Sequence, residues 1–419
     1  MAWPISHESL AGYQRTTYES LGFGIEQQDD DHVWSGIGKV APSLGEELEV
    51  FLTRWLGIPN FAQRFSDQIH RDDTISLLLN HTVTGFSFDG ARVNGLAVMT
   101  PHGEVRDLAA RVIVLAAGTI ESVRILLHAA RLGSGNCPWR HNENVGRYFA
   151  DHIGGRAAEV KPLEGFQDAF STIVLNKQKY APKLRYKDQL LERNLELNIQ
   201  GFFSFEGSIS ENLAVLKQFV KSALYSREIK GVLPLTRNLV GCARYLPPLM
   251  WRYLVDNRIF LPSGSTVSFM VQAEQPASRF SRIEIDPNDL DSYGLPRVLL
   301  DWQVDSERVL QGIYRFVSRA DDALRASDLA ELAMVAELAE HCDDYLRLLR
   351  DTSHQSGGAV MSRSARTGVV DENLRVYGTE NLFVCGAATF PTVSNANTTF
   401  LALTLATRLG EHLARFFGR

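Results

Sequence analysis

The chain of 419 residues contains no G-x-G-x-x-G segment. That glycine pattern, set between a strand and a helix, forms the phosphate cradle of the common dinucleotide-binding folds. Its absence excludes a complete phosphate-binding half of that kind from the chain, although later segments are typical of nucleotide-binding α/β folds.

Cysteine is scarce and scattered. The four cysteines are Cys137, Cys242, Cys342 and Cys385, with no C-x-x-C pair and no spacing of metal ligands. This distribution predicts reduced, mostly buried thiols and argues against a zinc site. We therefore expect no metal centre.

An excess of positive charge and long apolar runs are also missing. Lys and Arg total 43 against 49 Asp and Glu, a formal charge of −6 that argues against a nucleic-acid partner. No apolar run approaches the roughly 18 residues that a membrane-spanning helix needs. The start, Met1 to Ile5, has neither a basic nor an apolar signal region, so the sequence predicts a cytoplasmic protein.

Strand alternation first becomes clear between residues 75 and 100. The runs 75–83, 84–90 and 93–100 alternate between apolar and polar side chains, with turn signals at Asp89-Gly90 and His102-Gly103. A three-stranded meander is predicted there.

A buried strand followed by a helix is predicted next. The apolar run 112–117 indicates a strand buried on both faces, Gly118 breaks it, and residues 121–130 have helical composition. Such a corner is typical of nucleotide-binding α/β folds, whose helix N-terminus can face a phosphate or a ring system.

The ends and the middle of the chain differ in character. Residues 8–21 and 398–417 have helical spacing, 381–385 reads as a short buried strand, and the acidic run 27–31 is typical of a solvated loop. Between 156 and 345 the β-like runs are 195–205, 265–273, 282–286 and 297–304, and the helical runs are 213–225 and 306–348.

We therefore predict a mixed α/β fold in three parts. Residues 1–155 form a partial nucleotide-binding domain, 156–350 a second domain built on a sheet, and 351–419 return to the first domain.

Two residues near the C-terminus suit chemistry on an alcohol. Oxidation by hydride transfer needs a base for the hydroxyl proton, a cofactor as electron sink and a neutral donor for the developing charge. His354 fits the first task and the carboxamide of Asn397 the third. Each also has an ordinary alternative, a hydrogen-bonded structural histidine and a helix cap.

The neighbouring candidates have structural alternatives as well. Gly118 can simply close a turn and Glu121 can sit in the first turn of a helix. Gly357-Gly358 can be a plain loop, and His152 can be a structural histidine.

Several short segments, in a fixed order along the chain, resemble the motifs of one enzyme family. They are Ala116–Ser122, Asn144–His152, Glu274-Gln275, Arg282–Asp286, Asp291–Arg297, Val370–Gly378, Asn381–Val384 and Phe390-Pro391. Each piece is weak, but the ordered set resembles the glucose–methanol–choline (GMC) oxidoreductases, a family of FAD enzymes. The resemblance runs from Trp3 nearly to the end.

The resemblance implies a discontinuous Rossmann-like FAD domain with a sheet-based substrate domain over the flavin. By motif position, His354 takes the role of the catalytic histidine and Asn397 that of the second active-site residue. The implied cofactor contacts are Val83, Ala117, Gly118, Glu121, Gly386, Ala387, Thr398 and Thr399.

The implied function is oxidation of a CH–OH group by hydride transfer to FAD. The His/Asn combination and Gly357-Gly358 look most like family members acting on sugars and polyols. A sterol-type oxidase is a weaker alternative. The small-molecule alcohol and the final electron acceptor are left open by the sequence.

The sequence departs from the family where the pyrophosphate of FAD would lie. It opens at Trp3-Pro4-Ile5, which in relatives lies far from the start; Gly386 stands where many relatives have Asp, and Val360-Met361 replaces Arg-Met. The alternatives are a start codon placed too late, a gene split so that a separate N-terminal FAD-binding fragment is the partner, and a truncated non-catalytic remnant. An unfilled slot in the parallel sheet would expose apolar surface, so we predict poor solubility or weak flavin occupancy.

Overall fold

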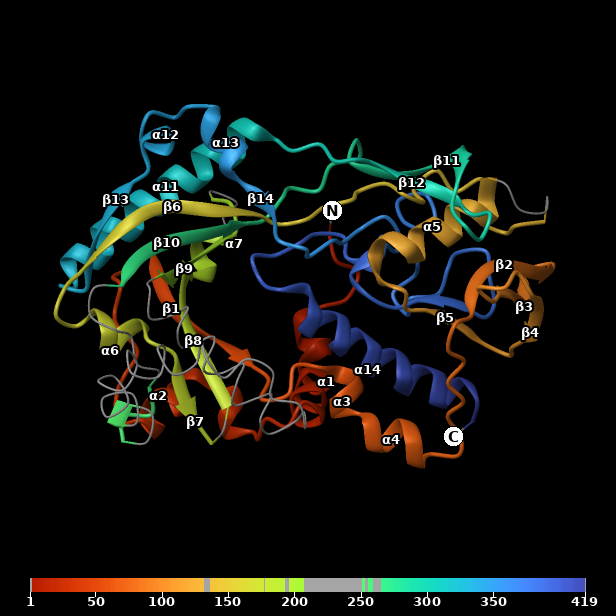
Figure 1. The fold of residues 1–419 in the computed structure, drawn as a ribbon, viewed down its shortest axis with the longest axis horizontal. Helices are drawn as coiled ribbons and strands as arrows, with labels where there is room; N and C mark the ends of the chain where they lie inside the picture. The colour runs from red at the N-terminus through yellow and green to blue at the C-terminus, as the bar shows by residue number, and fades with distance from the viewer. Residues whose placement is uncertain are drawn as a thin grey trace, which may run out of the picture.

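The structure is a computed structural model that describes residues 2–131, 136–176, 178–192, 196–206, 251–252, 255–258 and 265–418. The predicted helical run 213–225 and Cys242 lie outside the described residues. Two hydrophobic cores organise the described chain, one under a large antiparallel sheet and one around a small parallel sheet. Figure 1 shows the large sheet on the left, and α5 (Gly118–Arg131) and α14 (Thr398–Phe416) on the right.

The large sheet has eight strands, in the order β1-β8-β9-β10-β6-β13, with β7 paired to β8 and β14 paired to β6. All of its pairings are antiparallel. The strands are β1 (Leu48–Trp55), β6 (Ile153–Pro162), β7 (Ile173–Leu175), β8 (Gln178–Tyr186), β9 (Ile199–Glu206), β10 (Thr266–Ala273), β13 (Ala330–Met334) and β14 (Arg350–Asp351). The predicted β-like runs 195–205 and 265–273 are confirmed as β9 and β10.

One face of this sheet packs on helix α11 (Ser306–Ala326). The opposite face, which carries Lys183, Gln200 and Gln272 beside Phe202, is called the polar face. Tyr180, Leu184 and Tyr186 of β8 lie on the same face of the strand and are all buried. The ring of Tyr186 contacts Phe316 of α11, with the centroids 5.1 Å apart. Because side chains alternate between the faces of a strand, Lys183 projects from the opposite face.

Helix α11 is shorter than the sequence predicted. The side chain of Asp305 caps its start by accepting the N–H of Arg308 at 3.2 Å. Asp328, just after the helix, takes a positive φ of 52°, and the chain turns into β13. The predicted continuous helix over 306–348 is therefore wrong, because a left-handed residue ends it. Two short helices, α12 (Ala336–Ala339) and α13 (Asp344–Leu348), follow β13.

The second core surrounds a parallel pair of strands, β5 (Ile113–Leu115) and β15 (Leu382–Val384). Gly118 follows β5 with φ 77°, and α5 starts there and buries Val123 and Leu126. Helix α14 buries Leu405 and Leu409 and packs against α1 (His7–Ser20). The predicted strand–glycine–helix corner, the C-terminal strand and both terminal helices are confirmed.

A meander and a hairpin complete this half of the molecule. The meander consists of β2 (Thr82–Asp89), β3 (Arg92–Met99) and β4 (Val105–Ala109), and the hairpin of β11 (Arg282–Leu290) and β12 (Pro296–Asp301). The predicted turns hold, with positive φ at Gly90 and Gly103. The strand limits were wrong, because residues 75–81 form no strand and β4 lies beyond the second turn. The remaining helices are η1 (Glu26–Gln28), α2 (Asp30–Gly36), α3 (Phe61–Arg64), α4 (Ser66–Arg71), α6 (Phe166–Phe170), α7 (Asp188–Glu192) and η2 (Ala387–Thr389).

Two local predictions are wrong. Val114 is 39% exposed, whereas Ile113 and Leu115 are buried, so β5 is buried on one face only. The side from which Val114 projects is open to solvent. The acidic run 27–31 is not a solvated loop but the junction of η1 and α2. There Asp29 caps α2, and Asp30 forms a 2.7 Å ion pair with Arg54 of β1.

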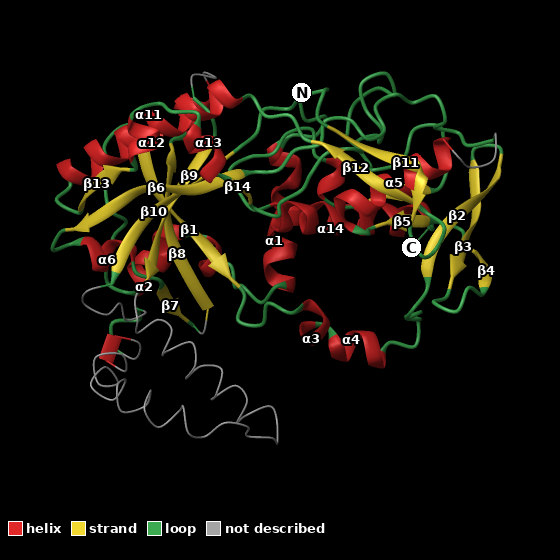
Figure 2. Ribbon diagram, turned by 45° about the horizontal axis from the view of Figure 1, so that its top comes forward, coloured by secondary structure: helices red, strands yellow, loops and turns green. Residues whose placement is uncertain are grey.

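Two pairs of contacts cross the expected domain boundaries at 155 and 350. β1 comes from the N-terminal stretch, yet it pairs with β8 in the large sheet. β11 and β12 come from the central stretch, yet β11 packs against α5, and Ile283 and Ile285 belong to the second core. Figure 2 shows β11 and β12 beside α5, away from the large sheet.

Within the described ranges, no helix combines the length and the apolar character that crossing a bilayer requires.

Candidate active site

Two imidazoles meet where the large sheet joins the second core. The Nδ1 atoms of His152 and His354 lie 3.1 Å apart, and the two rings meet edge-on with centroids 5.1 Å apart. His152 directly precedes β6. Two residues, Thr352 and Ser353, separate His354 from β14. Because Asp351 of β14 pairs with Ile153 of β6, this short ladder brings together two histidines 202 positions apart.

The loop that carries His354 is anchored by Asp151. Its Oδ1 accepts the backbone N–H of His354 at 3.0 Å, and it accepts the Thr352 hydroxyl at 3.5 Å. The Thr352 Oγ1 in turn lies 2.7 Å from Nδ1 of His354. Ser353 between them takes a positive φ of 59°, so the loop is held in a conformation that a non-glycine residue rarely adopts.

The partners of His152 assign the protons on both rings. Its Nε2 lies 2.5 Å from the carbonyl oxygen of Ser394, which can only accept, so Nε2 carries a hydrogen. The Gln272 Nε2 donates to Nδ1 of His152 at 3.1 Å, which makes that Nδ1 an acceptor. Nδ1 of His354 faces this acceptor at 3.1 Å and the Thr352 hydroxyl at 2.7 Å, so we assign the ring hydrogen of His354 to Nδ1. Its Nε2 then carries a lone pair, and no described residue hydrogen-bonds to it. This is the form that a general base needs.

Burial keeps both rings neutral near pH 7. It lowers the pKa of His152 to about 4, and it also lowers the pKa of His354. The positive charge of Lys183 acts in the same direction on both histidines. A neutral His354 is ready to accept a proton.

Two glycines let the His354 loop pack tightly. Gly357 has φ 77°, and a Cβ built there would overlap the carbonyl oxygen of Tyr148. Gly358 has φ 84°, and a Cβ there would come within 2.7 Å of Val123 on α5. The pair is therefore required by close packing and is not a plain loop.

The loop is also tied to the parallel sheet. Gly357 N–H donates to the carbonyl of Ala387 at 3.0 Å, and the Thr119 hydroxyl donates to the carbonyl of Gln355 at 2.6 Å. Thr119 lies in the first turn of α5, and Ala387 starts η2 after β15. The imidazole pair and the carboxyl ends of β5 and β15 thus form one connected region.

The sequence of this region matches a known family. Residues 276–406 match the family described as GMC oxidoreductase. The match covers about a third of the chain, and this segment is called the GMC domain. The family indicated by the motifs is confirmed, and the GMC domain contains His354, Gly357-Gly358 and Asn397, whereas His152 lies outside it.

One curated relative matches part of the chain. The gluconate 2-dehydrogenase flavoprotein of Pantoea cypripedii is 27% identical over 127 residues, which is 30% of this chain and 20% of that protein. The matched segment therefore represents only a fifth of its length.

Solved structures match nearly the whole chain. Pyridoxine 4-oxidase from Mesorbium loti has a TM-score of 0.57 at 15% identity, over 98% of this chain and 71% of that one. A fungal aryl-alcohol oxidase has a TM-score of 0.53 at 15% identity, over 92% and 70%. A formate oxidase variant from Aspergillus oryzae RIB40 has 0.51 at 14% identity, over 99% and 71%. The predicted fold class, a mixed α/β fold of GMC type, is confirmed.

Asn397 closely follows Ser394, which contacts His152, but within the described residues no hydrogen bond joins Asn397 to either imidazole. It is the N-cap residue of α14 and is exposed, and its side chain makes no capping hydrogen bond. The contacts come from its neighbours: the Ser394 carbonyl binds His152, and the Asn395 carbonyl accepts from Gln272 at 3.0 Å. The role of Asn397 stays a prediction.

The other predicted residues of the GMC site spread over four elements. Gly118 and Gly386 follow the two parallel strands, and a Cβ on either would meet no atom within 4 Å. Thr398 and Thr399 open α14, and Val83 lies in β2 of the meander. The remaining three are Ala117, whose N–H donates to Ser122 Oγ at 3.2 Å, Glu121, which pairs with Arg124 at 3.2 Å, and Ala387.

Several residues of the region were not predicted from sequence. Thr352, Gln272, Asn395 and Lys183 carry no motif signal, and His152 had a structural alternative. The position of Asp151-His152 inside a family motif was the available signal.

Asp151, His152 and His354 lie close enough together to resemble the ligands of a metal site. Their ligand atoms lie within 4.8 Å of one another. The carboxylate oxygen accepts the His354 N–H, and the two Nδ1 atoms bond to each other. Internal hydrogen bonds thus account for the arrangement without an ion.

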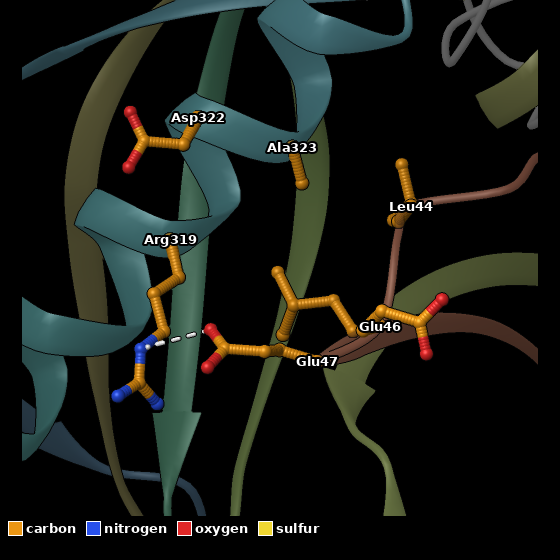
Figure 3. Close-up of a pocket in the computed structure, with 7 residues that line it drawn as sticks. Leu44, Glu46, Glu47, Arg319, Asp322 and Ala323 are labelled. Carbon is orange, nitrogen blue, oxygen red and sulfur yellow. Dashed lines mark ion pairs between the residues drawn. The ribbon is translucent and has the colours of Figure 1, made fainter.

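A separate hollow of about 250 Å³ lies between α11 and the start of β1, on the opposite face of the large sheet (Figure 3). Among the described residues that line it, the one cation, Arg319, is already paired. Arg319 bonds Glu47 at 3.1 Å and Glu196 at 3.0 Å. It shares no residue with the region around His354.

Proposed function

We propose that the chain is an FAD-dependent oxidoreductase that oxidises a CH–OH group of a sugar-like or polyol substrate. The single observation that supports this most strongly is the pair of contacts at Nδ1 of His354. Its Nδ1 is occupied toward His152 and Thr352, so its free Nε2 lone pair is the group that accepts the hydroxyl proton.

The surrounding residues hold this base in place. Asp151 and Thr352 fix the loop, and His152 holds the ring by its Nδ1–H. Because the ring is neutral when substrate binds, proton transfer to it creates the imidazolium only as the alkoxide forms. The negative charge that develops on the substrate oxygen is therefore balanced by the positive charge that forms on the imidazole.

The chain fits the flavin end of the cofactor. The carboxyl ends of β5 and β15 are a usual ligand position in parallel sheets, and there Gly118 and Gly386 leave open space. The N–H groups of the first turn of α5 have no helical acceptors, which suits an anionic or ring acceptor group. When bound, FAD supplies the hydride acceptor that no side chain provides. Gly118, Gly386, Ala387, Thr398 and Thr399 are the residues that would hold it.

The relatives support a hydroxyl-bearing substrate. An aryl-alcohol oxidase and a gluconate 2-dehydrogenase flavoprotein stand among them. The second name favours a sugar-derived compound over a sterol.

The test is His354→Ala in the form of the protein that carries FAD. Flavin reduction is followed at 450 nm by stopped flow with a panel of sugars, sugar acids and polyols. We expect the rate to fall by about 10²–10⁴-fold, the usual contribution of a general base. Undiminished reduction would remove His354 from the chemistry, and no reduction of the wild type by any alcohol would remove the function.

A second candidate, a subunit that needs an N-terminal partner, is favoured by one observation. Ile75, Leu77, Leu78 and Leu79 are 47–68% exposed, and Val114 of the parallel sheet is also exposed. Such a contiguous apolar segment is typical of an interaction surface. Co-expression with a separate fragment containing a strand and a G-x-G-x-x-G loop tests it: flavin occupancy should rise toward one per chain only with the fragment. Full occupancy of the chain alone would exclude this candidate.

A further inference from the structure

Lys183 is a cation without an anionic partner on the polar face of the large sheet. Its Nζ donates to Oε1 of Gln200 at 3.3 Å and lies 4.8 Å from the ring centroid of Phe202. Across the described residues it forms no ion pair, and burial lowers its pKa to about 8. At neutral pH it is therefore mostly a charged ammonium with unused donors.

Gln200 beside it has a donor without an acceptor. The residue is 1% exposed, its Oε1 accepts from Lys183, and its Nε2 is buried with no hydrogen-bond partner. The Nδ2 of Asn395 is likewise buried without a partner. A buried N–H with no acceptor costs roughly 1–3 kcal/mol, so two in one region point to acceptor atoms that a ligand brings.

The register of the sheet connects these donors to the imidazole pair. Gln200 of β9 stands directly opposite Gln272 of β10, so both side chains lie on the same face. Gln272 donates to His152 at 3.1 Å and to the Asn395 carbonyl at 3.0 Å. A continuous polar surface thus runs from Lys183 to the base.

The carboxylates near this surface are already engaged. Asp151 accepts the His354 N–H, Glu274 accepts the N–H of Asn198 at 3.1 Å, and Glu49 pairs with Arg185 at 2.7 Å. None of them contacts Lys183 within the part of the chain that the structure describes. The positive charge is therefore uncompensated until something binds.

We propose that Lys183 and Gln200 bind the carboxylate of the substrate, which narrows the proposed function to a preference for hydroxy acids of the sugar-acid type over neutral sugars and polyols. The ammonium pairs with one carboxylate oxygen, and the Gln200 Nε2–H donates to the other. The hydroxyl to be oxidised lies further along the carbon skeleton of the same substrate molecule, toward His354. The oxidation step rests on the proposed function, but the binding step does not.

The test measures binding separately from oxidation. Isothermal titration of the full chain, with and without added FAD, uses D-gluconate and its neutral counterpart D-glucitol as probes. We expect gluconate to bind at least about tenfold more tightly, because charge-assisted hydrogen bonds exceed neutral ones. Lys183→Met should remove that preference, whereas Lys183→Arg should retain most of it.

The matched control is Lys179→Met, which removes an exposed lysine from the same strand, β8. It should leave the preference unchanged. Circular dichroism melts of each variant establish that the sheet is folded. Gln200→Leu should weaken gluconate and leave glucitol unaffected.

Three results would overturn the proposal: equal affinity for the two probes, gluconate binding that survives Lys183→Met, or inorganic phosphate competing as strongly as gluconate. Failure of the proposed function has a different signature. In that case gluconate binds in a Lys183-dependent manner, but no substrate reduces the flavin.

Discussion

The Nδ1 atoms of His152 and His354 face each other at 3.1 Å, and the far side of His152 is fixed by the Ser394 carbonyl. Hydrogen bonds thus connect three groups in series: the Ser394 carbonyl, the His152 ring and the His354 ring. This arrangement makes the outer nitrogen of His354 the free end of the series. The predictions below start from that geometry.

His152→Ala should slow flavin reduction by about ten- to a hundredfold and leave KM nearly unchanged. The substitution removes the acceptor for the Nδ1–H of His354, so the ring can rotate and change tautomer. The substitution should also let water reach the His354 ring. Because burial is what lowers the pKa of His354, that pKa should rise, and the pH at which the rate falls should rise with it. Stopped-flow rates from pH 5 to 9 measure both effects. His102→Ala, at an exposed turn, is the control; an unchanged pH profile in His152→Ala would contradict a positioning role.

The rate should persist into mildly acidic solution. His354 has a pKa below its usual 6.5, because burial and Lys183 disfavour the imidazolium. The base form therefore remains populated at pH 6.5, and the acid limb of the profile of kcat/KM should lie below that value. A limb at or above pH 6.5 that is absent in His354→Ala would show that the ring is not buried as described.

Folding stability should fall as the pH is lowered from 6.5 to 4. His152 has a pKa of about 4 in the folded chain against 6.5 when solvated, so the unfolded chain binds more protons in this window. The contribution of neutral His152 to the free energy of unfolding is fully present above pH 6.5. By pH 4 roughly 3 kcal/mol of it is lost, an upper estimate for a fully buried ring. Urea unfolding at pH 7.0, 5.5 and 4.5 measures it. His152→Gln should flatten this dependence, and an equally steep loss in that variant would assign it to other groups.

Gly357→Ala should destabilise the fold far more than Gly294→Ala. Both glycines have a positive φ, 77° and 74°, but a Cβ at Gly357 overlaps the Tyr148 carbonyl, whereas one at Gly294 meets nothing within 4 Å. We expect roughly 3 kcal/mol or more at Gly357 and about 1 kcal/mol at Gly294. Chemical denaturation compares them directly. Equal losses would mean that the His354 loop moves away without cost.

Replacing Leu77, Leu78 and Leu79 by serine should reduce self-association of the isolated chain. These side chains are 52–68% exposed and adjacent, and such surface drives association. Light scattering at several concentrations measures the effect. Val40→Ser, at an isolated apolar residue that is 84% exposed, should change little. A wild-type chain that is monodisperse at high concentration would contradict the prediction.

Elements with strong local signals were predictable. The i+4 spacing of leucines such as Leu405 and Leu409 predicted α14. Gly118 after an apolar run predicted the β5–α5 corner. Local signals failed where tertiary structure decides. The helical composition of 306–348 hid β13, because pairing with β6 outweighs helix propensity there.

The site was predictable only in part. His354 stood out through its motif, but its partner depends on a two-residue ladder between β14 and β6 that has no sequence signature. Asn395 and Asn397 are two residues apart, and composition cannot tell that the first is buried and the second exposed. Lys183 and Gln200 required the register of three strands.

The β-bridge between Asp351 and Ile153 keeps His354 beside His152, so the state of this edge of the sheet can be followed through the imidazole pair. The imidazole N–H that lies between the Nδ1 atoms of His152 and His354 is shielded from exchange with water while the pair is intact. Its NMR signal would vanish as soon as this edge of the sheet frays, long before the whole molecule melts. That resonance would therefore report, in any variant or ligand complex, whether the base is still aligned.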